Sequence, residues 1–302
     1  MVELMEASIA ETARGRKLRQ WPLAALLGLL VWGLPALAQA AEQGLFAPLR
    51  AQLLAQGLSP AQTDTLFKHP GLHFEAGLMA RMLARPEKPR DYAQFFNSTT
   101  IKLARDFSRR HAQTLARVQR QTGVSPPVVV SILTIESGLG TYTGRWPAFN
   151  VLASQAILDT PLAQAELARR WPASQKATLT RPEFHQRLQK RAAWARSEIM
   201  ALLKLSKQWG VSPWSVMGSP AGALGMSQFM PTSILLWGAD GDGDGRVDLT
   251  RPVDAMFSVA NYLKAHGWRP GLGRQAQAEV VHAYNHSRPY VDTVLELARR
   301  IQ

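Results

Sequence analysis

A single carboxylate, Glu136, ends an apolar segment and is followed directly by small residues. Residues 132–140 read Ile-Leu-Thr-Ile-Glu-Ser-Gly-Leu-Gly, which places an acid where a helix meets a cleft. A carboxyl group held partly out of water stays protonated near neutral pH and can give its proton to a leaving group. We therefore interpret Glu136 as a candidate general acid; the alternative is a structural glutamate paired with an arginine such as Arg145.

A second segment, residues 218–231, combines small residues with two hydrogen-bonding side chains. The small residues at 221–223 and 225 permit close approach of another helix or of a sugar ring. Ser219 and Gln228 bring polar groups into this otherwise apolar stretch. Taken alone, the segment favours tight packing with Gln228 satisfied in the core, and ligand binding is the alternative.

The acidic loop at residues 240–254 has the spacing of a calcium-binding loop. It carries carboxylates at positions 1, 3 and 5, a glycine at position 6 and an apolar residue at position 8. Arg251 stands where such loops usually carry a glutamate, so a longer loop would have to use Asp254 instead. The predicted ligands are Asp240, Asp242, Asp244, Asp254 and the backbone carbonyl of Arg246. Calcium here would hold the loop rather than do chemistry, and the alternative is a polar turn without metal.

Aromatic and amide side chains gather near the C-terminus, at Tyr284, Asn285 and Tyr290. Aromatic rings stack on sugars, and amides supply directional hydrogen bonds, so the cluster is typical of a sugar site. An ordinary loop is the alternative. The nearby His286 has no second histidine at the spacing of a zinc motif.

Helices must position these groups, because no strand-like alternation exceeds a few residues. The pattern predicts a long amphipathic helix over about 99–121, followed by a second helix capped by Ser125. Glu136 shares the apolar stripe of this second helix, so its carboxyl should point toward the interior. Gly138 and Gly140 should end the helix. The predicted fold class is mainly α.

Composition limits the chemistry and indicates export. The 302 residues include no cysteine, which excludes disulfides, thiolate metal sites, a cysteine nucleophile and a lipid-modified cysteine. Residues 1–40 read as a cleavable signal peptide, with a basic leader, an apolar stretch and Ala38-Gln39-Ala40 before the cut; an uncleaved membrane anchor is the alternative. A net charge of +13 attracts polyanions. For an exported protein, the more available polyanion is the cell wall, and a nucleic-acid partner is not expected.

The four motifs, in their order along the chain, resemble those of the lytic murein transglycosylase B family over about residues 90–302. The most specific segments are Gly123-Val124-Ser125-Pro126-Pro127 before Glu136, Ala221-Gly222-Ala223-Leu224-Gly225 before Gln228-Phe229-Met230-Pro231, and residues 254–268. The resemblance implies a lysozyme-like catalytic core (residues 123–302, with the EF-hand-like calcium loop 240–254) and an additional N-terminal helical domain (residues 41–122).

The resemblance also implies the activity and the residues that carry it. Glu136 would be the single acid/base of a peptidoglycan lytic transglycosylase, a carbon–oxygen lyase in the periplasm. The residues implied to line the glycan cleft are Ser219, Gln228, Tyr262, Tyr284, Asn285, Tyr290 and Tyr92. The expected ligands are glycan strands and structural calcium, with no organic cofactor and no stable membrane insertion after signal cleavage. Wall-synthesis or division proteins are candidate partners. The alternatives are a hydrolytic muramidase of the same fold and a non-catalytic wall-binding protein.

Overall fold

The computed structural model describes residues 42–84 and 92–302. The signal peptide predicted for residues 1–40 lies outside this range. Within the described ranges, no helix combines the length and the apolar character needed to cross a membrane.

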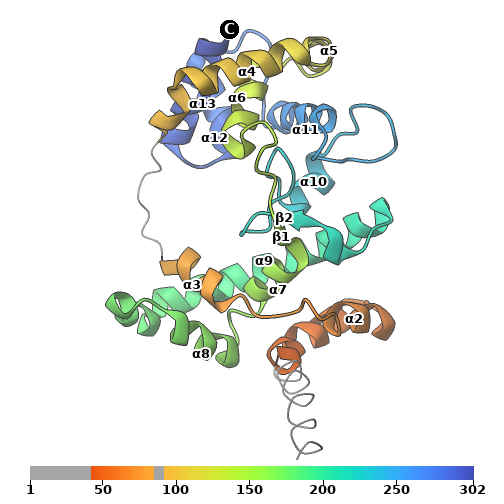
Figure 1. Ribbon diagram of the computed structural model, residues 1–302, viewed down its shortest axis with the longest axis vertical. Helices are drawn as coiled ribbons and strands as arrows, with labels where there is room; N and C mark the ends of the chain where they lie inside the picture. Colours follow the sequence, from red (N-terminus) through yellow and green to blue (C-terminus); the bar gives the residue numbers. More distant parts are fainter. Residues whose placement is uncertain (1–41, 85–91) are drawn as a thin grey trace, which may run out of the picture. The chain divides into compact units, whose positions relative to one another are not determined.

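The described residues are mainly helical, which confirms the predicted class (Figure 1). A first helix covers residues 42–55. The α-helices that follow it are α2 (Pro60–Phe67), α3 (Ala76–Ala84), α4 (Ser98–Arg110), α5 (Ala112–Thr122), α6 (Pro126–Ser137), α7 (Ala148–Ala156), α8 (Pro161–Arg170), α9 (Pro182–Trp209), α10 (Pro231–Trp237), α11 (Pro252–Ala265), α12 (Arg274–Tyr284) and α13 (Arg288–Ile301). Shorter elements are the 3-10 helices η1 (Ala93–Phe96), η2 (Ala173–Thr180) and η3 (Pro213–Ser215), and the strands β1 (Trp146–Pro147) and β2 (Met217–Gly218).

Within residues 42–84 and 92–302, the buried apolar side chains form two clusters, each built from segments far apart in the sequence. The first cluster joins residues 46–84 to the helices α7, α8 and α9. The second cluster joins the helices α4, α5 and α6 to α11, α12 and α13. Within it α6 packs against α13, α4 and α11 (Figure 1). The division into residues 41–122 and 123–302 stays a prediction.

The segment predicted as one helix over 99–121 is two helices, α4 and α5. They are separated at His111, whose φ of −109° and ψ of 20° leave the helical region. The apolar side chains of both halves, including Phe107 and Leu115, are nevertheless buried in the second cluster. The amphipathic pattern therefore located the buried face correctly but could not show that the helix is interrupted at His111.

The two strands pair antiparallel, with Trp146 opposite Gly218 and Pro147 opposite Met217. They hold the loop that follows α6 against the glycine-rich loop at residues 218–229. At the contact, Gly144 has a φ of +113°, and a Cβ added there would lie 2.1 Å from the carbonyl carbon of Gly218. A side chain at position 144 would thus collide with backbone that leads directly into the glycine-rich loop.

Candidate active site

The end of α6 fixes the position of Glu136. The helix begins at Pro126 and ends where Gly138 takes a left-handed conformation with a φ of 58°. The N–H of Leu139 then donates to the Leu133 carbonyl at 3.1 Å, which closes the last turn. Ser125 stands at the N-cap as predicted, but its side chain makes no capping hydrogen bond. Glu136 lies in the last turn and is half-buried, as its place on the apolar stripe indicated.

Tyr290 contacts the carboxylate directly. Its hydroxyl donates to Oε1 of Glu136 at 2.7 Å, from the first turn of α13, although 154 positions separate the two residues. Burial, and then the nearby charge of Glu136, raise the pKa of Tyr290 well above its ordinary value. Tyr290 therefore keeps its proton at physiological pH and remains a donor to Glu136.

Two further predicted tyrosines form an aromatic cluster beside Tyr290. The ring of Tyr284 stacks on Tyr290 with centroids 6.5 Å apart, and Tyr262 meets Tyr284 edge-on at 5.0 Å. Their hydroxyls donate to backbone carbonyls, Tyr284 to Ser227 and Tyr262 to Ala283, both at 2.7 Å. Burial, and then the charge of Glu136, raise the pKa of Tyr284 well above its ordinary value. Because both protons are engaged, these tyrosines order the wall of the site and can offer a ligand only an acceptor or a ring face.

The glycine-rich loop presents Ser219 and Gln228 in different ways. Gln228 adopts a φ of +50°, and its side-chain amide nitrogen donates to the carbonyls of Gly225 at 2.8 Å and Thr143 at 3.4 Å. Its Oε1 is left as the group that can accept from a ligand. The Oγ of Ser219 accepts from the N–H groups of Ala221 and Ala223, so its own hydroxyl proton can still be donated.

Tyr92 and Asn285 complete the predicted set. Tyr92 precedes η1 and meets Tyr290 edge-on at 6.4 Å. Asn285 follows α12 directly, and its backbone N–H closes the helix on Val281 at 3.3 Å. Tyr290 contacts Glu136 directly, and successive ring contacts connect the other three tyrosines to Tyr290. Asn285 follows Tyr284 in the sequence.

His266 is part of this arrangement, although sequence analysis predicted no role for it and only included it in the segment 254–268 that carries the family resemblance. Its ring stacks on Tyr262 with centroids 4.0 Å apart, and its Nδ1 lies 2.7 Å from the Tyr262 carbonyl oxygen. His266 is the C-cap residue of α11 and follows Tyr262 by four positions, a spacing that puts them on one side of the helix end. That spacing was the signal that could have identified His266 as support for the aromatic wall.

The acidic loop brings three of its predicted ligands together. One carboxylate oxygen from each of Asp240, Asp242 and Asp244 lies within 4.8 Å of the others. Arg251 pairs with this group, with its Nη1 3.0 Å from Asp242 and 2.5 Å from Asp244. Backbone N–H groups, first that of Gly245, lower the pKa of the Asp240 carboxyl, so it is ionised and ready to bind a cation.

Asp254, the fourth predicted side-chain ligand, lies outside that group of three. It is fully buried, and its two oxygens accept from the N–H groups of Gly241 and Asp248, both at 2.8 Å. It therefore ties Gly241 and Asp248 of the acidic loop to the first turn of α11. The remaining predicted ligand is the Arg246 carbonyl. The N–H of Arg246 donates to Asp244 at 2.9 Å, which keeps this backbone inside the loop.

The acidic loop is joined to the glycine-rich loop at Leu249. The Leu249 carbonyl accepts from the N–H of Met226 at 2.7 Å, and Leu249 is almost completely buried. A Cβ added to Gly225 would lie 2.4 Å from the Cβ of Leu249, so glycine is what permits the contact. Met226 is followed by Ser227, whose carbonyl holds Tyr284. A series of hydrogen bonds and close contacts thus runs from the acidic loop to the aromatic wall beside Glu136.

The family model for the transglycosylase SLT domain matches residues 41–280. The chain belongs to the transglycosylase SLT domain family. This membership confirms the resemblance drawn from the order of the motifs. The matched residues include both the helix that carries Glu136 and the acidic loop.

One curated relative and several solved structures agree with this assignment. The chain is 33% identical to the membrane-bound lytic murein transglycosylase B of Escherichia coli K12 over 165 residues, 55% of this chain and 38% of that protein. The soluble lytic transglycosylase SltB1 of Pseudomonas aeruginosa matches with a TM-score of 0.68, 23% identity, and coverage of 86% of this chain and 98% of that one. An Escherichia coli lytic transglycosylase solved with calcium matches with a TM-score of 0.64, 20% identity, and coverage of 86% and 92%. The fold is therefore that of lytic transglycosylases, which confirms the fold expected from the resemblance and leaves the bounds of its core a prediction.

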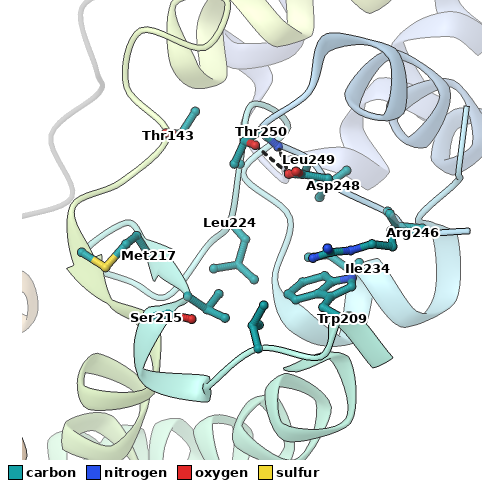
Figure 2. Close-up of a pocket in the computed structure, with 14 residues that line it drawn as sticks. Thr143, Trp209, Ser215, Met217, Leu224, Ile234, Arg246, Asp248, Leu249 and Thr250 are labelled. Carbon is teal, nitrogen blue, oxygen red and sulfur yellow. Dashed lines mark hydrogen bonds between the residues drawn. The ribbon is translucent and has the colours of Figure 1, made fainter. Parts of the chain in front are cut away.

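A separate cavity of about 300 Å³ lies beside the acidic loop rather than at Glu136 (Figure 2). Residues 246–250 of that loop form one wall, and Trp209 and Ile234 form another. Figure 2 labels Arg246 and Trp209 among the lining residues, and its dashed lines mark the hydrogen bonds from Thr250 to the Asp248 carboxylate. Thr143 and Gly225, whose carbonyls hold Gln228, also line it. The cavity therefore borders both the glycine-rich loop and the acidic loop, and part of its lining is apolar.

Proposed function

We propose that this chain is a lytic transglycosylase that cleaves the β-1,4 bond between N-acetylmuramic acid and N-acetylglucosamine in peptidoglycan. The observation that carries the proposal is the hydrogen bond from Tyr290 to a half-buried carboxylate, Glu136, at the end of α6. Membership of the transglycosylase SLT domain family, and 33% identity to a protein named lytic murein transglycosylase B, support it.

Glu136 acts first as the acid. It transfers its proton to the bridging oxygen, and the bond from that oxygen to the anomeric carbon of N-acetylmuramic acid breaks. The positive charge that develops on the anomeric carbon is supported by the substrate's own N-acetyl group. Most glycosidases use a second carboxylate at this stage. A nucleophile already within the substrate removes that need.

Glu136 acts next as the base. Its carboxylate takes the proton of the 6-hydroxyl group, and the hydroxyl oxygen bonds to the anomeric carbon. The product ends in 1,6-anhydromuramic acid, no water is consumed, and Glu136 is protonated again. Because the nucleophile belongs to the same sugar, much of the entropic barrier is removed.

The cleft residues then have distinct proposed roles. The hydroxyl of Ser219 and the amide of Asn285 would orient the N-acetyl group and polarise its carbonyl. The free Oε1 of Gln228 accepts from a sugar hydroxyl, and Tyr92 offers a ring face near Tyr290. Tyr284 and Tyr262 keep this wall rigid through their bonds to backbone carbonyls.

Digestion of purified peptidoglycan sacculi tests the proposal against its two alternatives. A lytic transglycosylase releases soluble fragments that end in anhydro sugars, each lighter by one water than the hydrolysis product. A muramidase of the same fold releases fragments with reducing ends. A non-catalytic wall-binding protein sediments with sacculi and releases nothing.

Tyr290→Phe should lower kcat by about tenfold or more while leaving the fold intact. The substitution removes the donor to Glu136 and keeps the ring that packs on Tyr284, and a hydrogen bond to a charged group contributes about 1.5–3 kcal/mol. Initial rates on sacculi across a range of pH measure the effect. Tyr142→Phe, at an exposed tyrosine, is the matched control. Equal rates for Tyr290→Phe and the control would show that the bond does not position Glu136.

We also propose that the acidic loop binds calcium as a structural ion. The three clustered carboxylates fit, because ligands 2.3–2.6 Å from one ion lie at most about 5 Å apart. Asp240, Asp242 and Asp244 would hold it, with the Arg246 carbonyl, and Asp254 would contribute through lone pairs not used by backbone N–H groups. Calcium would add positive charge that offsets the mutual repulsion of the carboxylates. The Escherichia coli relative solved with calcium supports this proposal.

Calcium should raise the melting temperature of the chelator-treated protein. At a concentration 100 times Kd, a ligand specific for the native state adds about 2.7 kcal/mol of stability, or roughly 5–10 °C for a chain of this size. The shift should vanish in Asp240→Asn with Asp242→Asn and persist in Asp292→Asn, which alters an exposed acid on α13. Differential scanning calorimetry with and without calcium measures it. No shift in the unsubstituted protein would favour a polar turn without metal.

The proposed function places the protein in the periplasm. The export signal expected at residues 1–40 and the basic net charge of +13 suit an enzyme that works on the anionic cell wall. Glycan strands are the proposed partner, and wall-synthesis or division proteins are further candidates. Amino-terminal sequencing of the exported protein tests the signal; an intact Met1 end would contradict cleavage.

A further inference from the structure

A basic groove lies between α4 and the C-terminal turn of α13, apart from Glu136. Its volume is about 680 Å³, and five of its seven lining residues are cationic: Ser98, Ile101, Lys102, Arg105, Arg109, Arg299 and Arg300. The polar α4 members, at positions 98, 102, 105 and 109, recur at intervals of four, three and four residues, so they share one face of that helix, and Ile101 borders it. Ile101 is the one apolar side chain in this lining.

Acidic neighbours neutralise only part of this charge. Asp106 pairs with Arg109, and Glu296 pairs with Arg299 and Arg300. Hydrogen bonds from Arg299, and then from Arg300, lower the pKa of Glu296 to about 2, so it is ionised at any physiological pH. Five cations against two anions leave an excess of three positive charges around the groove. Such a surface selects an anionic ligand.

The groove is connected to the candidate active site through η1 and α13. At one end of η1, Tyr92 meets the ring of Tyr290; at the other, the guanidinium of Arg300 lies 4.6 Å from the ring centroid of Phe96. Along α13, Tyr290 and Arg299 are nine residues apart, or about 14 Å at 1.5 Å per residue. α13 therefore contributes Tyr290 to the contact with Glu136 and Arg299 and Arg300 to the groove, while η1 and its N-cap Tyr92 pack against both ends of α13.

We propose that the basic groove binds the carboxylates of the stem peptide carried by the N-acetylmuramic acid residue that is cleaved at Glu136. The proposal rests on the proposed function and adds a determinant of substrate choice to it. A stem of three to five residues, at about 3.4 Å each, reaches roughly 10–17 Å, which spans the distance along α13. Stem peptides carry free carboxylates, and the guanidinium groups of arginine bind carboxylates through paired hydrogen bonds.

An anionic membrane surface is a less suitable occupant. Protein segments that bind such surfaces combine basic residues with apolar side chains that enter the lipid. This groove is concave and offers only Ile101. A flexible peptide with separate carboxylates fits such a space better than a flat layer of phosphates.

The test compares binding to intact sacculi with binding to sacculi whose stem peptides have been removed by an amidase. All variants carry Glu136→Gln, so the walls are not digested during the measurement and the result does not depend on turnover. Co-sedimentation gives an apparent Kd for each wall. The parent should bind intact walls about tenfold more tightly than peptide-free walls, and salt should reduce this preference.

Lys102→Gln with Arg105→Gln should abolish most of that tenfold preference, since two of the five cations are lost. Arg105 also donates to the Arg300 carbonyl at 2.6 Å, so Lys102→Glu alone serves as a second variant that leaves this bond in place. Arg187→Gln with Lys190→Gln removes the same charge from exposed positions on α9 and should keep the preference.

Three results would overturn the proposal: no preference of the parent for intact walls, an unchanged preference in both groove variants, or an equal loss in the α9 control. Vesicles containing anionic phospholipid provide the remaining comparison. If the groove variants lost vesicle binding and kept their preference for intact walls, the groove would serve a lipid surface instead. Failure of cleavage by the wild-type protein would contradict the proposed function and is measured separately.

Discussion

Glu136→Gln should fold like the wild type and cleave sacculi at least about 1,000-fold more slowly. General acid–base catalysis contributes 10²- to 10⁴-fold to a rate, and here one side chain carries both the acid and the base step. The amide has nearly the shape of the carboxyl group but cannot give up a proton and recover it. Tyr290 can still donate to the remaining oxygen, so packing at the end of α6 is preserved.

Release of soluble fragments from sacculi measures this loss, and circular dichroism with thermal unfolding checks the fold. Glu183→Gln, which makes the same chemical change at an exposed position on α9, is the control and should retain full activity. Turnover by Glu136→Gln close to that of this control would remove Glu136 from the mechanism. Loss of both activity and fold would instead make Glu136 a structural residue.

Gly144→Ala should lower the free energy of unfolding by about 3–5 kcal/mol, which is more than most single substitutions cost. Two effects combine at this position. A φ of +113° is strained for any residue with a side chain, and the added Cβ would lie 2.1 Å from the carbonyl carbon of Gly218. The obstacle is backbone rather than a flexible side-chain end, so relief requires the strands β1 and β2 to separate.

Gly267→Ala is the matched control, because Gly267 has a similar φ of +99° and nothing within 4 Å of an added Cβ. Its free energy of unfolding should fall only by the cost of the strained backbone conformation, about 1–2 kcal/mol. Chemical denaturation of both variants measures the difference. Activity of folded Gly144→Ala should also fall, since Gly218 is followed directly by Ser219. Equal losses of stability would show that the approach of the two loops is not tight.

Local sequence signals predicted the helix that carries the proposed acid. Pro126 near its start, the apolar run and Gly138 at its end are all short-range features, and the structure places the helix at Pro126–Ser137. Half-burial of Glu136 followed from its position relative to Ile132 on the same stripe. The break at His111 did not follow, because both flanking segments keep the same buried face and no proline or glycine marks the break.

The contacts that define the site are non-local, and the residues alone could not supply them. The aromatic cluster near the C-terminus predicted a sugar site, but only the fold brings Tyr290 to Glu136 across 154 positions. Prediction from the sequence was limited in the same way at the acidic loop. Its spacing predicted converging carboxylates, yet it could not reveal that Asp254 holds the N–H groups of Gly241 and Asp248.

Digestion of sacculi in water labelled with oxygen-18, followed by mass spectrometry of the fragments, tests the central claim most directly. If Glu136 passes a proton from the 6-hydroxyl group to complete an intramolecular attack, fragments from the wild-type protein end in anhydro sugars without the heavy isotope. Labelled reducing ends would mean that water is the nucleophile, and the lytic transglycosylase mechanism proposed for this chain would be wrong.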